Sequence, residues 1–268
     1  MQIYRARLRL WEHTYFASRE IGILYETEPL VGNYALAYAL GLARAPYNWG
    51  EGPRYRQDLM PLNEAGVYVT PATFEPETLR FALSQFNAQS DSYFSAFANN
   101  AIVAPPTGWV AERSGQRWVL INPETGERRM VTASNFPQQG RIRMLGLGST
   151  ATFYLLADEQ KGALQLLDRL GLRLTGRMYV RLGKFNSKAQ IDWTRVEAEQ
   201  VAAQNVELAY MLNPADLPTD VRLVPLSVYY VHPTPLLAHC LMTGTFWRLG
   251  DGAGTMLPAG MRFGVDRL

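Results

Sequence analysis

The strongest constraint on the fold is a strict alternation of apolar and basic residues near the start of the chain. Between residues 3 and 10, one face of an extended chain would carry Tyr4, Ala6, Leu8 and Leu10, and the other Arg5, Arg7 and Arg9. Successive side chains of a β-strand point to opposite faces, so this period of two predicts a half-buried strand. Its outer face would offer a row of guanidinium groups to water or to a polyanion.

A second alternation covers residues 173–182. One face would carry Arg173, Thr175, Arg177, Tyr179 and Arg181, and the other Leu174, Gly176, Met178, Val180 and Leu182. The same reasoning predicts another half-buried strand, whose outer face is both basic and aromatic.

Further elements are predicted between these two stretches. They are strands at 67–69 and 152–156, an apolar helix over 30–42 that follows Pro29, and a helix over 158–170 that ends at Gly171. Strands at both ends with helices between them favour an α+β fold, in which an antiparallel sheet carries helices on one face. The other face would be open and would carry the arginine rows.

Two regions show weaker patterns. Residues 46–61 mix proline, glycine, tyrosine and tryptophan without a period and predict an irregular excursion. Residues of about 86–147 predict an inserted, thumb-like region, within which 117–121 and 128–132 flank a short loop as a β-hairpin would.

Composition narrows the class of protein. With 268 residues, 47% of them hydrophobic, the chain can bury a substantial core. It has no apolar run of the roughly 20 residues that cross a bilayer, and arginines occupy the start, where a signal peptide is apolar, so we expect a soluble, cytoplasmic protein. The single cysteine, Cys240, and the three scattered histidines favour neither a disulfide nor a metal site, and we expect no cofactor.

Charge is concentrated locally although the formal net charge is only +2. From Lys161 to Lys188 there are seven basic residues and one acidic residue, Asp168, which is the footprint of a site that follows phosphates. A solvated strand edge protected by charge would give the same pattern. Of the 26 basic residues all but Lys161, Lys184 and Lys188 are arginines. A GC-rich genome is the preferred explanation of this bias, and binding of phosphate by the planar guanidinium is the functional alternative.

The loop after the second alternating stretch adds other donors and a ring. It contains Lys184, Phe185, Ser187 and Lys188, which follow Arg177, Tyr179 and Arg181. Cations, hydroxyl donors and aromatic rings together suit single-stranded RNA better than a duplex, whose bases are not available to stack on side chains.

The C-terminal segment of about 244–268 is rich in glycine. Glycines stand at 244, 250, 252, 254, 260 and 264, and Arg262 lies among them. Such a segment would let backbone N–H groups approach a phosphate chain, although turn glycines explain the same composition.

Several phrases of the sequence together resemble one known family. The amino-terminal ones are Tyr15-Phe-Ala-Ser-Arg-Glu-Ile-Gly22, Leu24-Tyr-Glu-Thr-Glu28, Asn33-Tyr-Ala-Leu36 and Tyr38-Ala-Leu-Gly-Leu42. The later ones are Gly66-Val-Tyr-Val-Thr-Pro71, Gly183-Lys-Phe-Asn-Ser-Lys188 and Leu257-Pro-Ala-Gly-Met-Arg262. These phrases resemble the Csc-one family, the type I-D version of the Cas-five subunit of CRISPR Cascade. Residues of about 86–147 carry no phrase of this kind.

The resemblance implies one ferredoxin-like (RNA-recognition-motif-like) domain over 1–268 with a protruding thumb. It implies a subunit that caps the 5′ handle of the guide RNA (crRNA). Its implied neighbours are the repeated backbone subunit of the Cas-seven type and the large subunit of the Cas-ten-d type, which engages target DNA beside the protospacer-adjacent motif (PAM). By the match, RNA binding extends to Lys184, Lys188 and Arg262, and more weakly to Arg19 and Asn33.

Two other functions remain open. His13 with Tyr15 and a lysine could serve a metal-independent endoribonuclease that makes the handle, since such an enzyme needs only a base and a cation placed by the fold. The resemblance favours no catalytic residue, because in the type I-D branch a separate ribonuclease makes this cut. A single-strand binder without fixed partners is the third hypothesis.

Overall fold

The computed structural model gives a mixed α/β fold, with mostly antiparallel sheets and, in the part described, three α-helices. The structure describes residues 1–16, 18–21, 24–43, 54–88, 101–102, 105–114, 117–131, 134–135, 138–231 and 234–265. Two compact units are present. The first comprises 1–20, 26–82 and 143–268, and the second comprises 21–25 and 83–142.

The main sheet of the first unit has the strand order β15-β16-β1-β14-β6-β4, and β5 also pairs with β14. Its strands are β1 (Gln2–Leu10), β4 (Leu30–Val31), β5 (Val67–Val69), β6 (Ala72–Phe74), β14 (Thr150–Ala157), β15 (Gly176–Leu182) and β16 (Ser187–Val196). All of these pairs are antiparallel. The predicted strands at 3–10, 67–69 and 152–156 are therefore confirmed.

The second alternating stretch forms a shorter strand than predicted. β15 begins at Gly176, which has a positive φ of 73°, and its first pair in the register is with Trp193. Arg173 and Thr175 therefore lie before the strand and are exposed, outside the row that the alternation assigned to them.

The alternation of β1 matches the burial of its side chains. Ala6 and Leu8 are fully buried, whereas Arg7 and Arg9 on the other face are exposed. The buried face joins a core that also includes residues of the helices and of the C-terminal sheet. The face that carries the arginines is called the outer face below.

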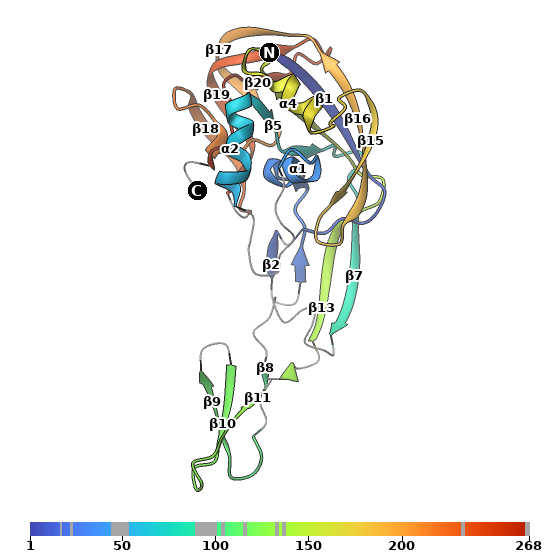
Figure 1. Ribbon diagram of the computed structural model, residues 1–268. Coiled ribbons are helices and arrows are strands. Elements are labelled where there is room, and N and C mark those ends of the chain that lie inside the picture. Colours follow the sequence, from blue (N-terminus) through green and yellow to red (C-terminus); the bar gives the residue numbers. More distant parts are fainter. Residues whose placement is uncertain are drawn as a thin grey trace. The chain divides into compact units, whose positions relative to one another are not determined.

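The described helices are α1 (Asn33–Ala39), α2 (Tyr55–Ala65) and α4 (Ala163–Arg169), with 3-10 turns at η1 (Glu159–Lys161) and η2 (Pro214–Asp216). Figure 1 shows α1, α2 and α4 together on one side of β1. No helix in the described ranges is long and apolar enough to cross a membrane.

Two helix predictions, and the prediction of an irregular segment, need correction. The helix expected over 30–42 starts only at Asn33, because Leu30 and Val31 pair with β6. The helix expected over 158–170 is divided at Gly162, whose φ is 85°. α2 occupies part of the segment predicted to be irregular and includes Pro61; residues 46–53 lie outside the described residues.

The C-terminal sheet has the order β17-β19-β18, with β20 paired to β19. These strands are β17 (Ala198–Leu208), β18 (Arg222–Tyr229), β19 (Leu236–Leu249) and β20 (Met256–Pro258). Gly244 lies inside β19, and a Cβ there would stand 3.0 Å from the Val221 side chain. The glycine-rich stretch is therefore not one flexible loop, because its first part is paired strand.

Three smaller sheets are present among the described residues, with the orders β2-β3-β13-β7, β11-β10-β9 and β12-β8. Their strands are β2 (Arg19–Ile21), β3 (Leu24–Glu26), β7 (Phe81–Ala88), β8 (Ala101–Ile102), β9 (Val110–Ser114), β10 (Arg117–Ile121), β11 (Arg128–Val131), β12 (Ser134–Asn135) and β13 (Gln138–Leu145). β10 and β11 pair antiparallel, and the Asn122 N–H donates to the Glu127 carbonyl at the turn between them.

A buried carboxylate connects four separate segments of the first unit. Asp216 is 1% exposed, and its oxygens accept hydrogen bonds from Asn33 Nδ2 at 2.6 Å, Tyr68 Oη at 2.9 Å, Tyr34 Oη at 3.2 Å and the Gly264 N–H at 2.7 Å. Buried polar groups must be satisfied to be tolerated, and here α1, β5 and the C-terminal segment supply the donors to a carboxylate carried by η2.

Gly264 is required where the C-terminal segment meets η2. A Cβ at this position would lie 2.1 Å from the Ala215 carbonyl oxygen, so a larger residue would displace the backbone. The amide of Asn63 donates to the Phe263 carbonyl and its oxygen accepts from the Phe263 N–H, both at 2.8 Å. This glycine therefore permits a close approach within the chain, rather than to a phosphate.

Asp216 should make stability depend on pH in an unusual direction. Burial raises its pKa from 3.8 to about 6, against the opposing effect of its hydrogen-bond donors. Its contribution to stability is then fully present below about pH 4 and is lost as the pH rises through about 6, because only the folded state holds the proton in this window.

We expect the unfolding free energy of the wild type to fall by about 3 kcal/mol across this window relative to Asp216→Asn, which cannot titrate. Urea unfolding of both proteins at several pH values measures the difference. Identical pH profiles would contradict the assignment of the raised pKa to Asp216.

Candidate nucleic-acid interface

The outer face of the main sheet is organised in cross-strand rows. In the β15–β16 register, Arg177 lies opposite Asp192, Tyr179 opposite Gln190 and Arg181 opposite Lys188. In the β16–β1 register, Asp192 lies opposite Arg7 and Gln190 opposite Arg9. Pairing thus brings residues of β1 onto one surface with those of β15 and β16, which lie far from it in the sequence.

Two aromatic rings and two cations form a cluster at one end of this face. We call Arg9, Trp11, Tyr179 and Lys188 the ring cluster. The rings of Trp11 and Tyr179 meet edge to face with centroids 6.4 Å apart. Lys188 Nζ stands 4.4 Å from the centroid of Tyr179 and 5.9 Å from that of Trp11, and Arg9 Cζ stands 6.0 Å from that of Trp11.

Gln190 sets the orientation of the indole. Trp11 Nε1 donates to Gln190 Oε1 at 3.1 Å, and Gln190 Nε2 donates to Asp192 Oδ2 at 2.6 Å. Gln190 is 6% exposed, whereas Trp11 is 47% and Tyr179 48% exposed. The polar support is buried and the rings are half open to solvent, an arrangement that can stack an unpaired base beside cations able to contact its phosphates.

Carboxylates accompany the arginines around the ring cluster. The ion pairs are Arg7–Glu75 at 3.3 Å, Arg177–Asp192 at 3.2 Å and Arg181–Glu12 at 3.6 Å. The hydrogen bond to Asp192 raises the pKa of Arg177 above its ordinary value. Glu12 also accepts a hydrogen bond from the Lys188 N–H at 2.7 Å.

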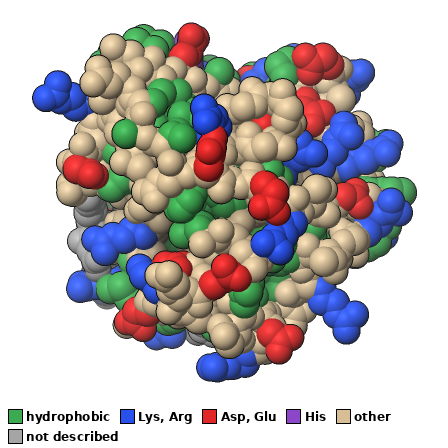
Figure 2. Space-filling model, turned by 90° about the horizontal axis from the view of Figure 1, so that it is seen from above, with side chains coloured by type: hydrophobic (Ala, Val, Ile, Leu, Met, Phe, Trp, Pro, Cys, Tyr) green, Lys and Arg blue, Asp and Glu red, His purple; other side chains and the backbone are tan. Residues whose placement is uncertain are grey.

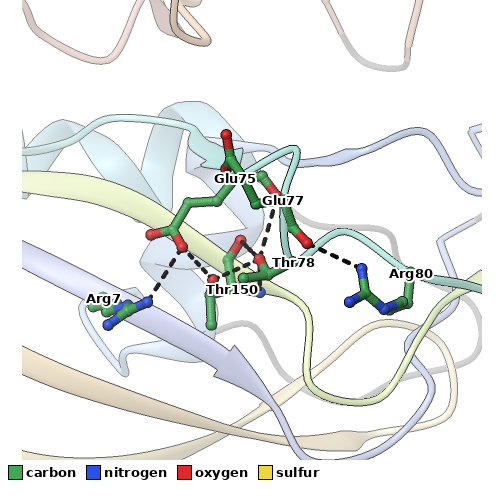
Figure 3. Close-up of polar contacts among 6 residues, drawn as sticks. All are labelled: Arg7, Glu75, Glu77, Thr78, Arg80 and Thr150. Atoms are coloured by element: carbon green, nitrogen blue, oxygen red, sulfur yellow. Dashed lines mark hydrogen bonds and ion pairs between the residues drawn. The ribbon is translucent and has the colours of Figure 1, made fainter.

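The Glu75 carboxylate is positioned by threonine hydroxyls as well as by its ion pair with Arg7. Thr150 Oγ1 donates to Glu75 Oε2, and the hydroxyls of Thr150 and Thr78 are 2.6 Å apart. Figure 3 shows Glu75 between Arg7 and this pair of threonines, with Arg80 bonded separately to the Glu77 carbonyl. The carboxylate is thus preoriented by groups outside the ion pair.

The loop from Gly183 to Asn186 is fixed against the segment that follows β1. Gly183 has a φ of 71°, and a Cβ there would lie 2.5 Å from the Tyr15 carbonyl oxygen. The Lys184 N–H donates to that oxygen at 2.8 Å, and Phe185 stacks on Tyr15 with centroids 5.3 Å apart. Partial burial lowers the pKa of the Lys184 ammonium, while Phe185 remains 41% exposed.

The structure brings some predicted site residues together and separates others. Arg177, Tyr179, Arg181 and Lys188 share the outer face, and Lys184 and Phe185 lie on the loop that joins β15 to β16. Ser187 is 2% exposed and donates to the His13 carbonyl at 2.7 Å. Asn33 is 1% exposed and is bonded to Asp216, so in this structure both side chains serve the fold.

Three further candidates lie away from these rows. Arg19 pairs with Glu26 at 2.6 Å and with Glu28 at 3.5 Å, and belongs to β2. Arg262 is exposed, and its N–H donates to the Asp216 carbonyl. Arg173 precedes β15 and is exposed.

Sequence reasoning missed Trp11 and Gln190. Trp11 follows Arg9 by two residues and so would lie on the same face of an extended chain as the arginine row. Extending the alternation past Leu10 would therefore have identified it. Gln190 carries no comparable signal, because its role depends on the register between β16 and β1.

The face of the molecule that is seen from above carries charges of both signs. Figure 2 shows acidic side chains interspersed among basic ones on that face, with several basic groups gathered toward the right. That face is therefore not uniformly basic, as a face that bound any polyanion by charge alone would be.

The predicted catalytic alternative centres on His13. Its Nδ1 accepts a hydrogen bond from the Leu147 N–H at 3.2 Å, and Tyr15 is 3% exposed. His239 pairs with Glu207 at 2.7 Å, and His232 lies outside the described residues. Within the described ranges, no three His, Cys, Asp or Glu residues are grouped as metal ligands.

Comparison with known proteins gives one family and several structural neighbours. The family described as type I-D CRISPR-associated protein Cas5/Csc1 matches residues 1–266. Among curated proteins, no relative matches the chain.

The solved structures that resemble the chain are distant. Oligomeric Cmr4 from Pyrococcus furiosus is 11% identical, with a TM-score of 0.32, and the match covers 73% of this chain and 99% of that one. A chain of the type III-B Cmr-beta complex bound to cognate target RNA is 12% identical, with a TM-score of 0.38, covering 89% and 86%. Likeness at this level carries no argument about function.

Proposed function

Because the chain belongs to the type I-D CRISPR-associated Cas5/Csc1 family, we propose that it binds crRNA on the outer face of its main sheet and caps the 5′ handle of that RNA. The ring cluster is the observation that carries this proposal. Half-exposed aromatic rings beside cations suit unpaired bases, which can stack, and their phosphates.

The arrangement of the first unit supports a ferredoxin-like, RNA-recognition-motif-like core. Within the main sheet, β16, β1, β14 and β5 are neighbours in that order and are antiparallel throughout. α1 and α2 lie between β1 and β5 in the chain, and α4 lies between β14 and β15. RNA-recognition motifs likewise stack bases on aromatic residues of a sheet face. We propose the region of about 86–147 as the thumb inserted into this core.

The chain would act within a multi-subunit complex in the cytoplasm. Its proposed partners are crRNA, a backbone subunit of the Cas-seven type and a large subunit of the Cas-ten-d type, with target DNA near the PAM. The edge strand β18 supports association with other proteins, since Val224 and Leu226 are 55% and 51% exposed and Tyr230, just beyond it, is 83% exposed.

Co-expression tests the capping role. When the chain is produced with a CRISPR array and its neighbouring genes, affinity purification should recover several protein partners and a uniform short RNA with a constant 5′ handle. Sequencing of the co-purified RNA provides the measurement. Recovery of lone protein with heterogeneous RNA, or with none, would refute the proposal and favour a single-strand binder without fixed partners.

We propose that the chain itself does not cut RNA. His13 and Tyr15 motivate the competing endoribonuclease hypothesis, but Tyr15 is buried and stacked on Phe185. Purified protein should leave precursor RNA intact both in EDTA and in magnesium. If the purified protein cleaves precursor RNA and His13→Ala abolishes that cleavage, the endoribonuclease hypothesis would replace the capping role.

The ring cluster should supply stacking energy. Trp11→Ala or Tyr179→Ala should weaken binding of single-stranded RNA by about 1–3 kcal/mol for each base lost from the stack, and Lys188→Ala should reduce the salt slope of log K by about 0.7. Fluorescence anisotropy with repeat-derived RNA measures both effects. Tyr230→Ala is the matched control, because Tyr230 is exposed but lies just beyond β18; an equal loss in this control would count against the site.

A further inference from the structure

We infer that Glu12, Glu75 and Asp192 act as built-in counter-charges that keep the outer face from binding nucleic acid by charge alone, and so set its preference for single strands over duplexes. This inference rests on the proposed RNA-binding function. It assigns a specificity role to carboxylates that flank the site.

The first argument is the pattern of pairing. Three arginines of the outer face, Arg7, Arg177 and Arg181, each meet a carboxylate within 3.6 Å. The two cations of the ring cluster, Arg9 and Lys188, instead stand over aromatic rings. The cations of the ring cluster therefore contact aromatic rings, whereas the other three arginines of the outer face contact carboxylates.

The second argument is that these carboxylates are positioned. Glu75 is held by the Thr150 hydroxyl, Glu12 by the Lys188 N–H, and Asp192 by the buried amide of Gln190. Gln190 also connects Asp192 to Trp11, because its side-chain oxygen accepts a hydrogen bond from the indole N–H. One counter-charge is thus connected to the aromatic ring that would take the base.

The third argument concerns the strength of these pairs. The side chains of Arg7 and Arg177 are each 61% exposed and that of Arg181 is 63% exposed. Exposed ion pairs are weak, so a phosphate that arrives with stacking energy from its own base can displace the carboxylate. A duplex has no such energy to add, because its bases are not available to stack.

The consequence for binding follows from counterion release. Each arginine that remains paired with a carboxylate adds little to the number of neutralised phosphates, which fixes the salt dependence of binding. Single strands then bind through the ring cluster, whereas duplexes meet a face whose positive charge is largely balanced.

The test compares wild type with the triple variant Glu12→Gln, Glu75→Gln and Asp192→Asn. Each replacement keeps an acceptor oxygen for its hydrogen bond and removes the negative charge. Fluorescence anisotropy with mixed-sequence single-stranded RNA and with duplex RNA of the same sequence, from about 50 to 200 mM salt, gives affinities and salt slopes.

We expect the triple variant to bind duplex RNA roughly ten- to hundredfold more tightly, from about two- to fivefold for each neutralised carboxylate. The slope of log K for the duplex should steepen by about 0.9 for each carboxylate removed, because each freed arginine can then neutralise a phosphate. The affinity ratio between single strand and duplex should fall, because only the duplex depends on charge alone.

Glu199→Gln is the control, since Glu199 forms an exposed pair with Arg248 on the C-terminal sheet. It changes the net charge by the same amount as one test substitution and should leave both affinities unchanged. The single variants Glu12→Gln and Asp192→Asn, with melting temperatures, provide the same comparison if the triple variant is poorly folded.

The outcomes separate the inference from the function on which it rests. If wild type binds single-stranded RNA but the variants match it in duplex affinity and salt slope, the counter-charge role is wrong and RNA binding stands. If Glu199→Gln raises duplex affinity as much as a single test substitution does, the effect is due to net charge and the inference also fails. If wild type binds neither RNA, the proposed function and the inference fall together.

Discussion

The double pairing of β1 is the constraint on which the rest of the structure depends. β1 is hydrogen-bonded along nearly its whole length to β14 on one side and to β16 on the other. This pairing fixes a register in which a one-residue slip would turn the arginines inward and the leucines outward, so burial of the apolar face holds the outer face in place. This register of β1, together with the register between β15 and β16, places the ring cluster and the carboxylate-paired arginines on one face.

A second, polar constraint joins separate segments of the first unit. Asp216 gathers donors from α1, β5 and the C-terminal segment, and the backbone of Gly264 can reach it only because no side chain is present there. These donors offset only part of the cost of desolvating the carboxylate, since burial still raises the pKa of Asp216. The C-terminal segment is therefore part of the core of the first unit, although its sequence is typical of a loop.

The sequence predicts the elements whose signal is local. The period of two in residues 3–10 identifies β1, and the arginine and tyrosine parity of β15 places Arg177, Tyr179 and Arg181 on one face. α2 escapes prediction because Pro61 is unfavourable inside a helix and only packing overrides that preference. The partner of Arg7 could not be predicted either, since Glu75 lies 68 positions away and reaches it through the pairing of β14 with β6 and β1.

The position of β1 in the sheet also affects how the chain is made. β1 is synthesised before both of the strands that flank it: Ile3 pairs with Leu156 and with Val196, so neither edge has its partner until β14 and β16 in turn have been made. Long-range pairings of this kind slow folding and leave strand edges open to intermolecular association. The alternating arginines carry positive charge along one side of the waiting strand, and mutual repulsion would discourage two nascent chains from pairing through it. The residues that would meet RNA in the finished protein would then first protect it during synthesis.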